Sequence, residues 1–225
     1  MLAPFLGFGP RAHDWFRGLE ADNSKAYFET HRAVWDTEAR GPLDRLLEEL
    51  AAELGGSVRM FRPHRDTRFS KNKSPYKTNT YGVARMPENE SGLYVSIGAR
   101  GLHAGSGYWR MAPDQLARFR EAVAGPEGAA LDAATAAMQA SGLTLWGASL
   151  KTAPRGRPRD HARVHLLRMT ELLASDELDP GATLDGRHPK DFARSVWDRS
   201  REVMAWMDAH LGASTAPPEA RFGRR

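Results

Sequence analysis

The residues best suited to chemistry in this sequence are concentrated in one short stretch. Between residues 59 and 85, eight cationic side chains accompany a single acid, Asp66, so the segment carries a charge of +7. Arginine offers a planar fork of donors that fits phosphate or carboxylate with two hydrogen bonds, and lysine offers a compact positive charge. The segment therefore predicts a binding site for an anion. The residues expected to bind it are Arg62, Arg65, Arg68, Lys71, Lys73, Tyr76 and Lys77.

Asp66 has two roles open to it among these cations. It can orient an arginine through an ion pair, or it can act as a base. If a reaction takes place at the site, Asp66 is the expected catalytic residue, and the lysines would stabilise developing negative charge. Turn-forming residues follow it in the stretch SKNKSPYKTN, and turns can direct several backbone N–H groups at one anion.

An alternative interpretation is a solvated loop in which Asp66 forms a structural ion pair. The aromatic residues argue against a loop that is solvated throughout, because Phe61, Phe69 and Tyr76 alternate with the cations. We therefore expect at least part of the segment to pack against the rest of the protein.

A second basic segment spans residues 151–168 and carries +5, which leaves −8 for the remainder of a chain whose net charge is +4. Lys151 and Arg155 are expected to close the anion site from the other side. The stretch PRGRPR, residues 154–159, contains the core of a minor-groove AT-hook. It lies between apolar stretches that are expected to be folded, so a turn with exposed arginines is the preferred interpretation.

Several classes of protein are excluded or disfavoured by what the sequence lacks. It has no cysteine, which removes disulfides, thiolate nucleophiles and cysteine-based zinc sites. His161 and His165 lack the intervening glutamate of a zinc-protease motif, and no metal site is predicted. No phosphate-binding loop, nucleophile elbow or dinucleotide fingerprint occurs, so the sequence names no cofactor. Without an apolar run of 18 residues or a signal-like N-terminus, we expect a cytoplasmic protein that does not span a membrane.

The elements that must position these side chains follow the order helices, strands, helices. Apolar spacing predicts helices over residues 10–23, 24–40 and 42–54, with a break or kink at Gly41-Pro42. Between residues 58 and 111 helical periodicity fades and β-prone runs appear, which predicts a sheet of three to five strands. Later helices are expected over residues 112–124, 127–141, 162–174 and 191–211, with a short strand pair within residues 143–154.

This order indicates an α+β fold rather than alternating β and α units. The expected architecture has N-terminal helices, a central and mostly antiparallel sheet, and C-terminal helices packed on it. Residues 1–211 are predicted to form a single domain, and residues 212–225 a flexible C-terminal tail.

The stretch RDTRFSKNKSPYKTN resembles the central motif of the family known as domain of unknown function 2461, a group of uncharacterised bacterial and fungal proteins. GFGPRAHDWFRGLEADNSKAYFETHRAVWD before it and GASLKTAPRG after it extend the resemblance from about Phe5 to about Trp206. Asn72 stands where aspartate is usual in the family, so this position is not expected to supply an essential carboxylate. The resemblance implies a single α+β domain and places Lys151 and Arg155 beside the central motif, but it implies no activity.

Three functions compete on these observations. The first is the binding of a small anionic ligand, with phosphorylated compounds as the expected class, with or without turnover. The second is nucleic-acid binding, in which the cations follow a phosphate backbone and Phe61, Tyr76 or Trp109 stacks on bases. The third is a non-catalytic interaction module whose basic loop docks on an acidic partner. The acidic remainder of the chain favours a local basic cleft over a broad binding face, so the first is preferred.

Overall fold

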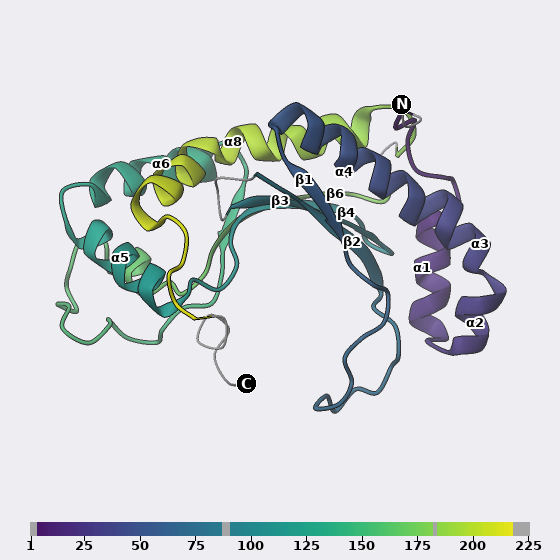
Figure 1. Ribbon diagram of the computed structural model, residues 1–225, viewed down its shortest axis with the longest axis horizontal. Helices are drawn as coiled ribbons and strands as arrows, with labels where there is room; N and C mark the ends of the chain where they lie inside the picture. Colours follow the sequence, from purple (N-terminus) through teal and green to yellow (C-terminus); the bar gives the residue numbers. More distant parts are fainter. Residues whose placement is uncertain (1–3, 87–90, 182–183, 218–225) are drawn as a thin grey trace. The chain divides into compact units, whose positions relative to one another are not determined.

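The computed structural model describes residues 4–86, 91–181 and 184–217. Figure 1 shows the N-terminal helices α1 to α4, the strands β1 to β4 that follow them, and the later helices α5, α6 and α8. The elements are α1 (Ala12–Ala21), α2 (Lys25–Thr30), α3 (Arg32–Val34), the π-helical turn η1 (Trp35–Arg40), α4 (Gly41–Leu54), β1 (Ser57–Met60), β2 (Asn79–Arg85), β3 (Gly92–Gly98), β4 (Gly101–Tyr108), α5 (Pro113–Ala124), α6 (Gly128–Ala140), β5 (Thr144–Trp146), α7 (Val164–Leu167), β6 (Leu172–Leu178) and α8 (His188–Leu211).

The α+β class predicted from the sequence is confirmed, with N-terminal helices and a C-terminal helix packed on an antiparallel sheet. The six strands follow the order β1-β2-β3-β4-β6-β5. β1 pairs with β2 in a register that sets Ser57 opposite Arg85, and β5 pairs with β6 with Thr144 opposite Ser175.

The helix predicted over residues 162–174 is wrong in its second half. Only Val164–Leu167 is helical, and Leu172–Leu178 forms strand β6. Residues 172–175 are all buried, because β6 lies between β4 and β5 in the sheet. A strand buried on both faces has a continuous apolar sequence, and such a short run cannot be told from a buried helix by periodicity.

The expected break at Gly41-Pro42 is instead a change of helical type. The chain passes from α3 through η1 into α4, and the N–H of Gly41 donates to the carbonyl of Asp36, five residues earlier. Proline has no N–H and its ring crowds the preceding turn, which a local π-helical turn accommodates. Gly55 then ends α4 at a φ of 70°, in the left-handed region that glycine adopts without strain.

The chain divides into two compact units. Unit 1 comprises residues 1–87, 93–104 and 177–195, and unit 2 comprises residues 88–92, 105–176 and 196–225. In unit 1, α4 packs across β1 and β2 (Figure 1). Its buried leucines recur at helical spacing, as the sequence predicts: Leu43, Leu46, Leu47 and Leu50.

Unit 1 also contains a buried ionic cluster. Lys190, in the first turn of α8, is 5% exposed and donates to Glu49 at 2.5 Å and to Glu53 at 2.6 Å, both on α4. Glu49 additionally accepts from the backbone N–H of Phe5, and Glu53 from Arg194. The cluster therefore fixes the start of α8, and the N-terminal segment, on α4.

In unit 2, the chain that follows α8 is attached to α5. Asp114 accepts from Ser214 Oγ at 2.8 Å and from the backbone N–H of Thr215 at 2.9 Å, and it pairs with Arg118. Burial favours the neutral carboxyl, but these hydrogen bonds outweigh it and hold the pKa of Asp114 well below its usual value. Residues 218–225 of the predicted flexible tail lie outside the described residues. No helix in the described ranges is long and apolar enough to cross a membrane.

Candidate functional site

The basic loop, residues 61–78, connects β1 to β2 and extends from the strands as two arms (Figure 1). Backbone hydrogen bonds join the arms: the N–H of Arg65 donates to Pro75 at 2.8 Å, and the N–H of Lys77 donates to Pro63 at 2.9 Å. His64 and Tyr76 form an isolated antiparallel bridge between them. The part of the loop nearest the sheet therefore has a defined backbone conformation.

Asn23, between α1 and α2, anchors this part of the loop. Its side-chain oxygen accepts from the N–H of Tyr76 at 2.9 Å, and its side-chain nitrogen donates to the carbonyl of Tyr76 at 3.2 Å. The Tyr76 ring is buried and stacks on Phe28, with the ring centroids 4.2 Å apart. The structure thus gives Tyr76 a packing partner in the N-terminal helices, and its expected contact with a ligand stays a prediction.

The cations of residues 59–85 are largely without acidic partners. Arg68 pairs with Asp66, whose two carboxylate oxygens accept from the guanidinium at 3.0 and 2.7 Å. None of the other seven forms an ion pair with a carboxylate in the described part of the chain. Lys73 and Lys77 donate to backbone carbonyls, of Thr67 and Arg62. The seven are Arg59, Arg62, Arg65, Lys71, Lys73, Lys77 and Arg85.

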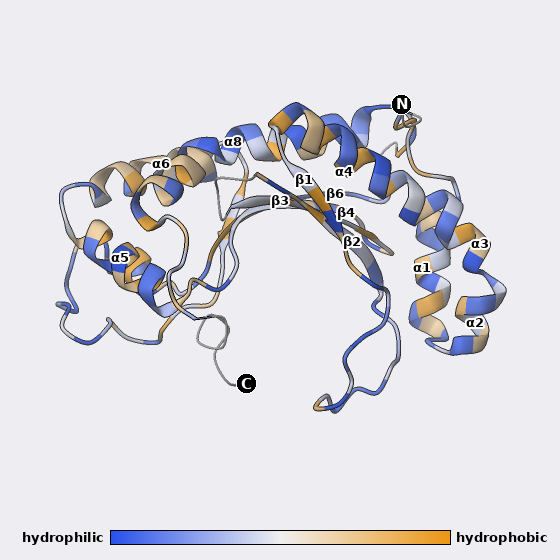
Figure 2. Cartoon of the chain, in the orientation of Figure 1, coloured by the Kyte–Doolittle hydropathy of each residue, from blue (hydrophilic) through white to orange (hydrophobic). Residues whose placement is uncertain are grey.

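The aromatic residues of the loop differ in how they pack. Phe61 stacks on Tyr81 at 4.7 Å, but Phe69 is 90% exposed. The expectation that at least part of the segment packs against the protein is therefore confirmed by Phe61 and Tyr76, which lie on the arms near the sheet, whereas Phe69 lies farther along the loop. Figure 2 shows the loop as hydrophilic along most of its length.

A row of rings continues from Phe61 across the face of the sheet that is turned away from α4. Tyr81 lies 5.4 Å from Tyr94, and Tyr94 lies 5.7 Å from His103. Lys77 places its ammonium 4.6 Å above the centre of the Tyr81 ring. Burial raises the pKa of Tyr94, although hydrogen bonds from neighbouring groups oppose the shift. One end of the basic loop is therefore continuous with this aromatic row.

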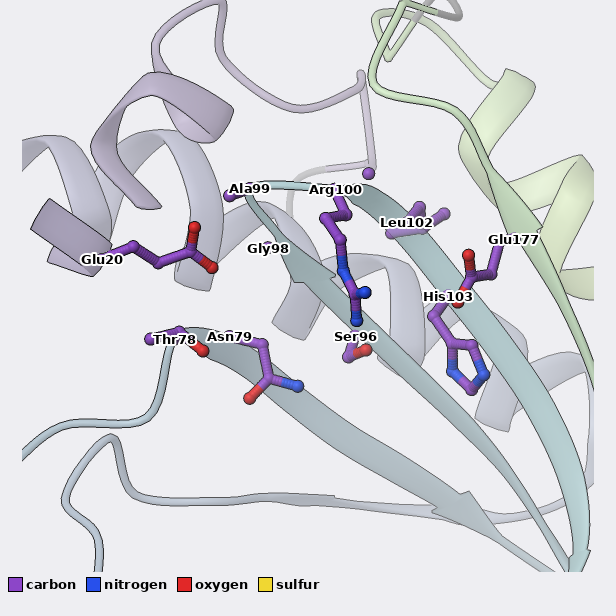
Figure 3. A pocket seen from close by; sticks show the side chains of 11 residues that line it. Glu20, Thr78, Asn79, Ser96, Gly98, Ala99, Arg100, Leu102, His103 and Glu177 are labelled. Atoms are coloured by element: carbon purple, nitrogen blue, oxygen red, sulfur yellow. The ribbon is translucent and has the colours of Figure 1, made fainter. Parts of the chain in front are cut away.

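A cavity of about 210 Å³ opens beside the row, entirely within unit 1. Figure 3 shows Glu20, from the end of α1, and Arg100, from the turn between β3 and β4, directed into it. His103 and Glu177 line the side formed by β4 and β6. The remaining lining residues are Thr78, Asn79, Ser96, Gly98, Ala99, Gly101 and Leu102.

Two charged side chains of the cavity, Glu20 and Arg100, have unused hydrogen-bonding capacity among the described residues. Within the described residues, neither the Glu20 nor the Arg100 side chain forms a hydrogen bond or an ion pair. His13 on α1 is 9% exposed, and its Nδ1 lies 2.6 Å from the carbonyl of the lining residue Gly98, while its buried Nε2 has no hydrogen-bond partner among the described residues. No motif in the sequence indicates that these residues come together.

The second basic segment belongs to unit 2. Arg157 pairs with Glu121, and Arg163 donates to the carbonyls of Val123, Ala124 and Gly125 at the end of α5. The predicted turn is confirmed: the N–H of Arg157 donates to Pro154 at 3.1 Å, across Gly156 at a φ of 80°. Lys151 and Arg155 are exposed. Their contribution to the anion site of unit 1 stays a prediction.

Trp109, a residue expected to stack on nucleic acid, also belongs to unit 2. It is exposed and makes an edge-to-face contact with Trp146 at 6.3 Å. His165 lies 3.1 Å from Asp132, and no group of three or more candidate metal ligands occurs among the described residues.

Comparison with protein families matches most of the chain. A family model described as a conserved hypothetical protein (DUF2461) matches residues 11–206. This span contains both basic segments and every residue of the cavity. No curated protein matches the chain.

Proposed function

The chain belongs to this family of conserved hypothetical proteins, and we propose that it binds a small anionic ligand of the phosphorylated class at the basic loop of unit 1. The observation that carries the proposal is the set of seven cations in residues 59–85 for which no described carboxylate forms an ion pair. A cluster of positive charge with few nearby acids creates a positive potential that attracts anions from solution.

Arg65 and Lys77 are the residues best placed to hold the anion. Both are only half-exposed and lie on the paired arms, so binding would cost them less conformational entropy than it would cost the outer lysines. Lys77 uses one donor on the carbonyl of Arg62, which leaves two further N–H groups for a phosphate oxygen. Arg62, Lys71 and Lys73 would add long-range attraction.

Asp66 fits the orienting role within this proposal. Its carboxylate receives the Arg68 guanidinium through two hydrogen bonds and also accepts from the Arg68 backbone N–H at 3.2 Å. The role of Asp66 as a catalytic base stays a prediction, as does the participation of Lys151 and Arg155 in the site. The cytoplasmic location and the bacterial origin that the family resemblance suggests also stay predictions.

The proposal is tested by titrating the protein with inorganic phosphate and measuring the dissociation constant by calorimetry. Arg65→Ala combined with Lys77→Ala should weaken binding at least about tenfold, because each charge-assisted hydrogen bond contributes roughly 1.5–3 kcal/mol. Lys25→Ala is the matched control, since Lys25 is an exposed cation of the same unit that pairs with Glu29 outside the loop. Unchanged phosphate affinity in the double variant would refute the proposal.

Nucleic-acid binding is the second candidate, and the exposed Phe69 favours it. An aromatic ring among cations can stack on a base, which contributes about 1–3 kcal/mol per base. Phe69→Ala should then weaken the binding of a fluorescent single-stranded oligonucleotide roughly 5- to 150-fold, while leaving the binding of inorganic phosphate unchanged. Absence of any anisotropy change at low salt would exclude this candidate.

A further inference from the structure

We infer that the cavity holds the hydroxylated body of the phosphorylated ligand, so that the ligand class is a polyol or sugar phosphate. This inference rests on the proposed function of the basic loop. It assigns the phosphate to the loop and the neutral, hydrogen-bonding part of the same molecule to the cavity between Glu20, Asn79, Arg100 and Glu177.

The lining of the cavity has the mixture of groups that hydroxyls require. A hydroxyl both donates and accepts, so a body with several hydroxyls is matched by carboxylates that accept and by amide or guanidinium groups that donate. Glu20 and Glu177 supply carboxylates, and Asn79 and Arg100 supply donors. Figure 3 shows these side chains converging from different elements around the same space.

The charges that line the cavity indicate which end of the ligand binds there and which end binds at the basic loop. Two carboxylates against one guanidinium make the cavity a poor place for a second anionic group. The cations that pair with no described carboxylate belong to the adjacent segment, where Lys77 is followed directly by the lining residues Thr78 and Asn79. The anionic group therefore belongs at the loop and the neutral group in the cavity.

The rings beside the cavity suit the apolar face of such a body. The ring centroids of Tyr94 and His103 lie 5.7 Å apart, and both rings belong to the aromatic row that passes beneath Lys77 at Tyr81. Asn79 connects the cavity to the aromatic row, because it lines the cavity and its side-chain nitrogen lies 3.5 Å from the Tyr94 hydroxyl. The volume of about 210 Å³ is below the roughly 300–1,000 Å³ of sites for drug-sized ligands, and therefore suits a body of about one small ring.

The inference is tested by measuring the affinity of the full chain for four probes: inorganic phosphate, phenyl phosphate, glycerol 3-phosphate and glucose 6-phosphate. Phenyl phosphate presents the same anion on an apolar body. At least one of the two polyol esters should have a dissociation constant at least about tenfold lower than those of inorganic phosphate and phenyl phosphate. This difference is expected for two or three additional net hydrogen bonds.

Two single variants locate the effect. Glu20→Ala and Asn79→Ala should each reduce the advantage of the polyol ester about fivefold or more, while leaving the affinity for inorganic phosphate unchanged. Glu29→Ala is the control, because Glu29 is an exposed glutamate of the same unit that pairs with Lys25.

The possible outcomes separate this inference from the proposed function. If inorganic phosphate binds but neither polyol ester exceeds phenyl phosphate, the inference is wrong and the anion site stands. If the advantage exists but survives both Glu20→Ala and Asn79→Ala, the body binds elsewhere and the inference is equally wrong. If neither inorganic phosphate nor any ester binds, the proposed function itself fails.

Discussion

Replacing Lys190 with methionine is expected to lower the free energy of unfolding by roughly 2–4 kcal/mol, because removing one partner of a buried ion pair leaves the other without compensation. The ammonium is buried and contacts both Glu49 and Glu53. Methionine keeps the length of the side chain but cannot donate. Urea-induced unfolding followed by circular dichroism measures the difference.

Arg194→Met is the matched control for this variant. Arg194 is 39% exposed and pairs with Glu53 at 3.1 Å from a later turn of the same helix. Exposed ion pairs contribute less than about 1 kcal/mol, so this variant should be nearly neutral. A loss for Lys190→Met no larger than that for Arg194→Met would show that the cluster contributes little.

The same cluster predicts that the free energy of unfolding depends on pH in the acidic range. Hydrogen bonds from Lys190 are the leading cause that holds the pKa of both Glu49 and Glu53 below its ordinary value of 4.5. A carboxyl whose pKa is lowered by folding stabilises the folded state above its unfolded pKa, and the contribution is lost as the pH falls through the folded pKa. The difference in stability between the wild type and Lys190→Met should therefore shrink below about pH 4.5.

Tyr76→Ala is expected to be the most damaging change within the basic loop. It removes a buried ring that stacks on Phe28, and truncations of buried aromatic side chains cost roughly 3–5 kcal/mol. For a chain of this size, thermal unfolding should shift downward by roughly 6–20 °C. Phosphate affinity should fall as well, because the arms that carry Arg65 and Lys77 lose their anchor.

Tyr76→Phe supplies the control. The Tyr76 hydroxyl has no hydrogen-bond partner in the described part of the chain, so the ring alone accounts for the packing and the variant should stay within about 1 kcal/mol of the wild type. Hydrogen exchange of the Arg65 and Lys77 amides distinguishes the two variants. Protection in Tyr76→Ala equal to that of the wild type would contradict an anchoring role.

The helices and the basic loop could be predicted because their signals are local. Leu43, Leu46, Leu47 and Leu50 recur at helical spacing within one segment, and the cations of the loop are contiguous in sequence. Strand β6 was mistaken for helix because its burial arises from two neighbouring strands that the sequence does not reveal.

The cavity could not be predicted for a related reason. Glu20, Asn79, Arg100 and Glu177 come from a helix, a strand, a turn and another strand. Each is an ordinary polar residue in its own segment. They meet because the strands follow the order β2-β3-β4-β6 and because α1 brings Glu20 to the same place, and neither arrangement can be inferred from the local sequence.

Asn23 binds both backbone groups of Tyr76 across 53 positions of sequence. The geometry of the loop therefore depends on a residue that carries no charge and belongs to a different segment. If the loop binds an anion as proposed, substitutions at Asn23 would change its affinity while the cationic motif stays identical, so relatives that share the motif need not share a preferred ligand.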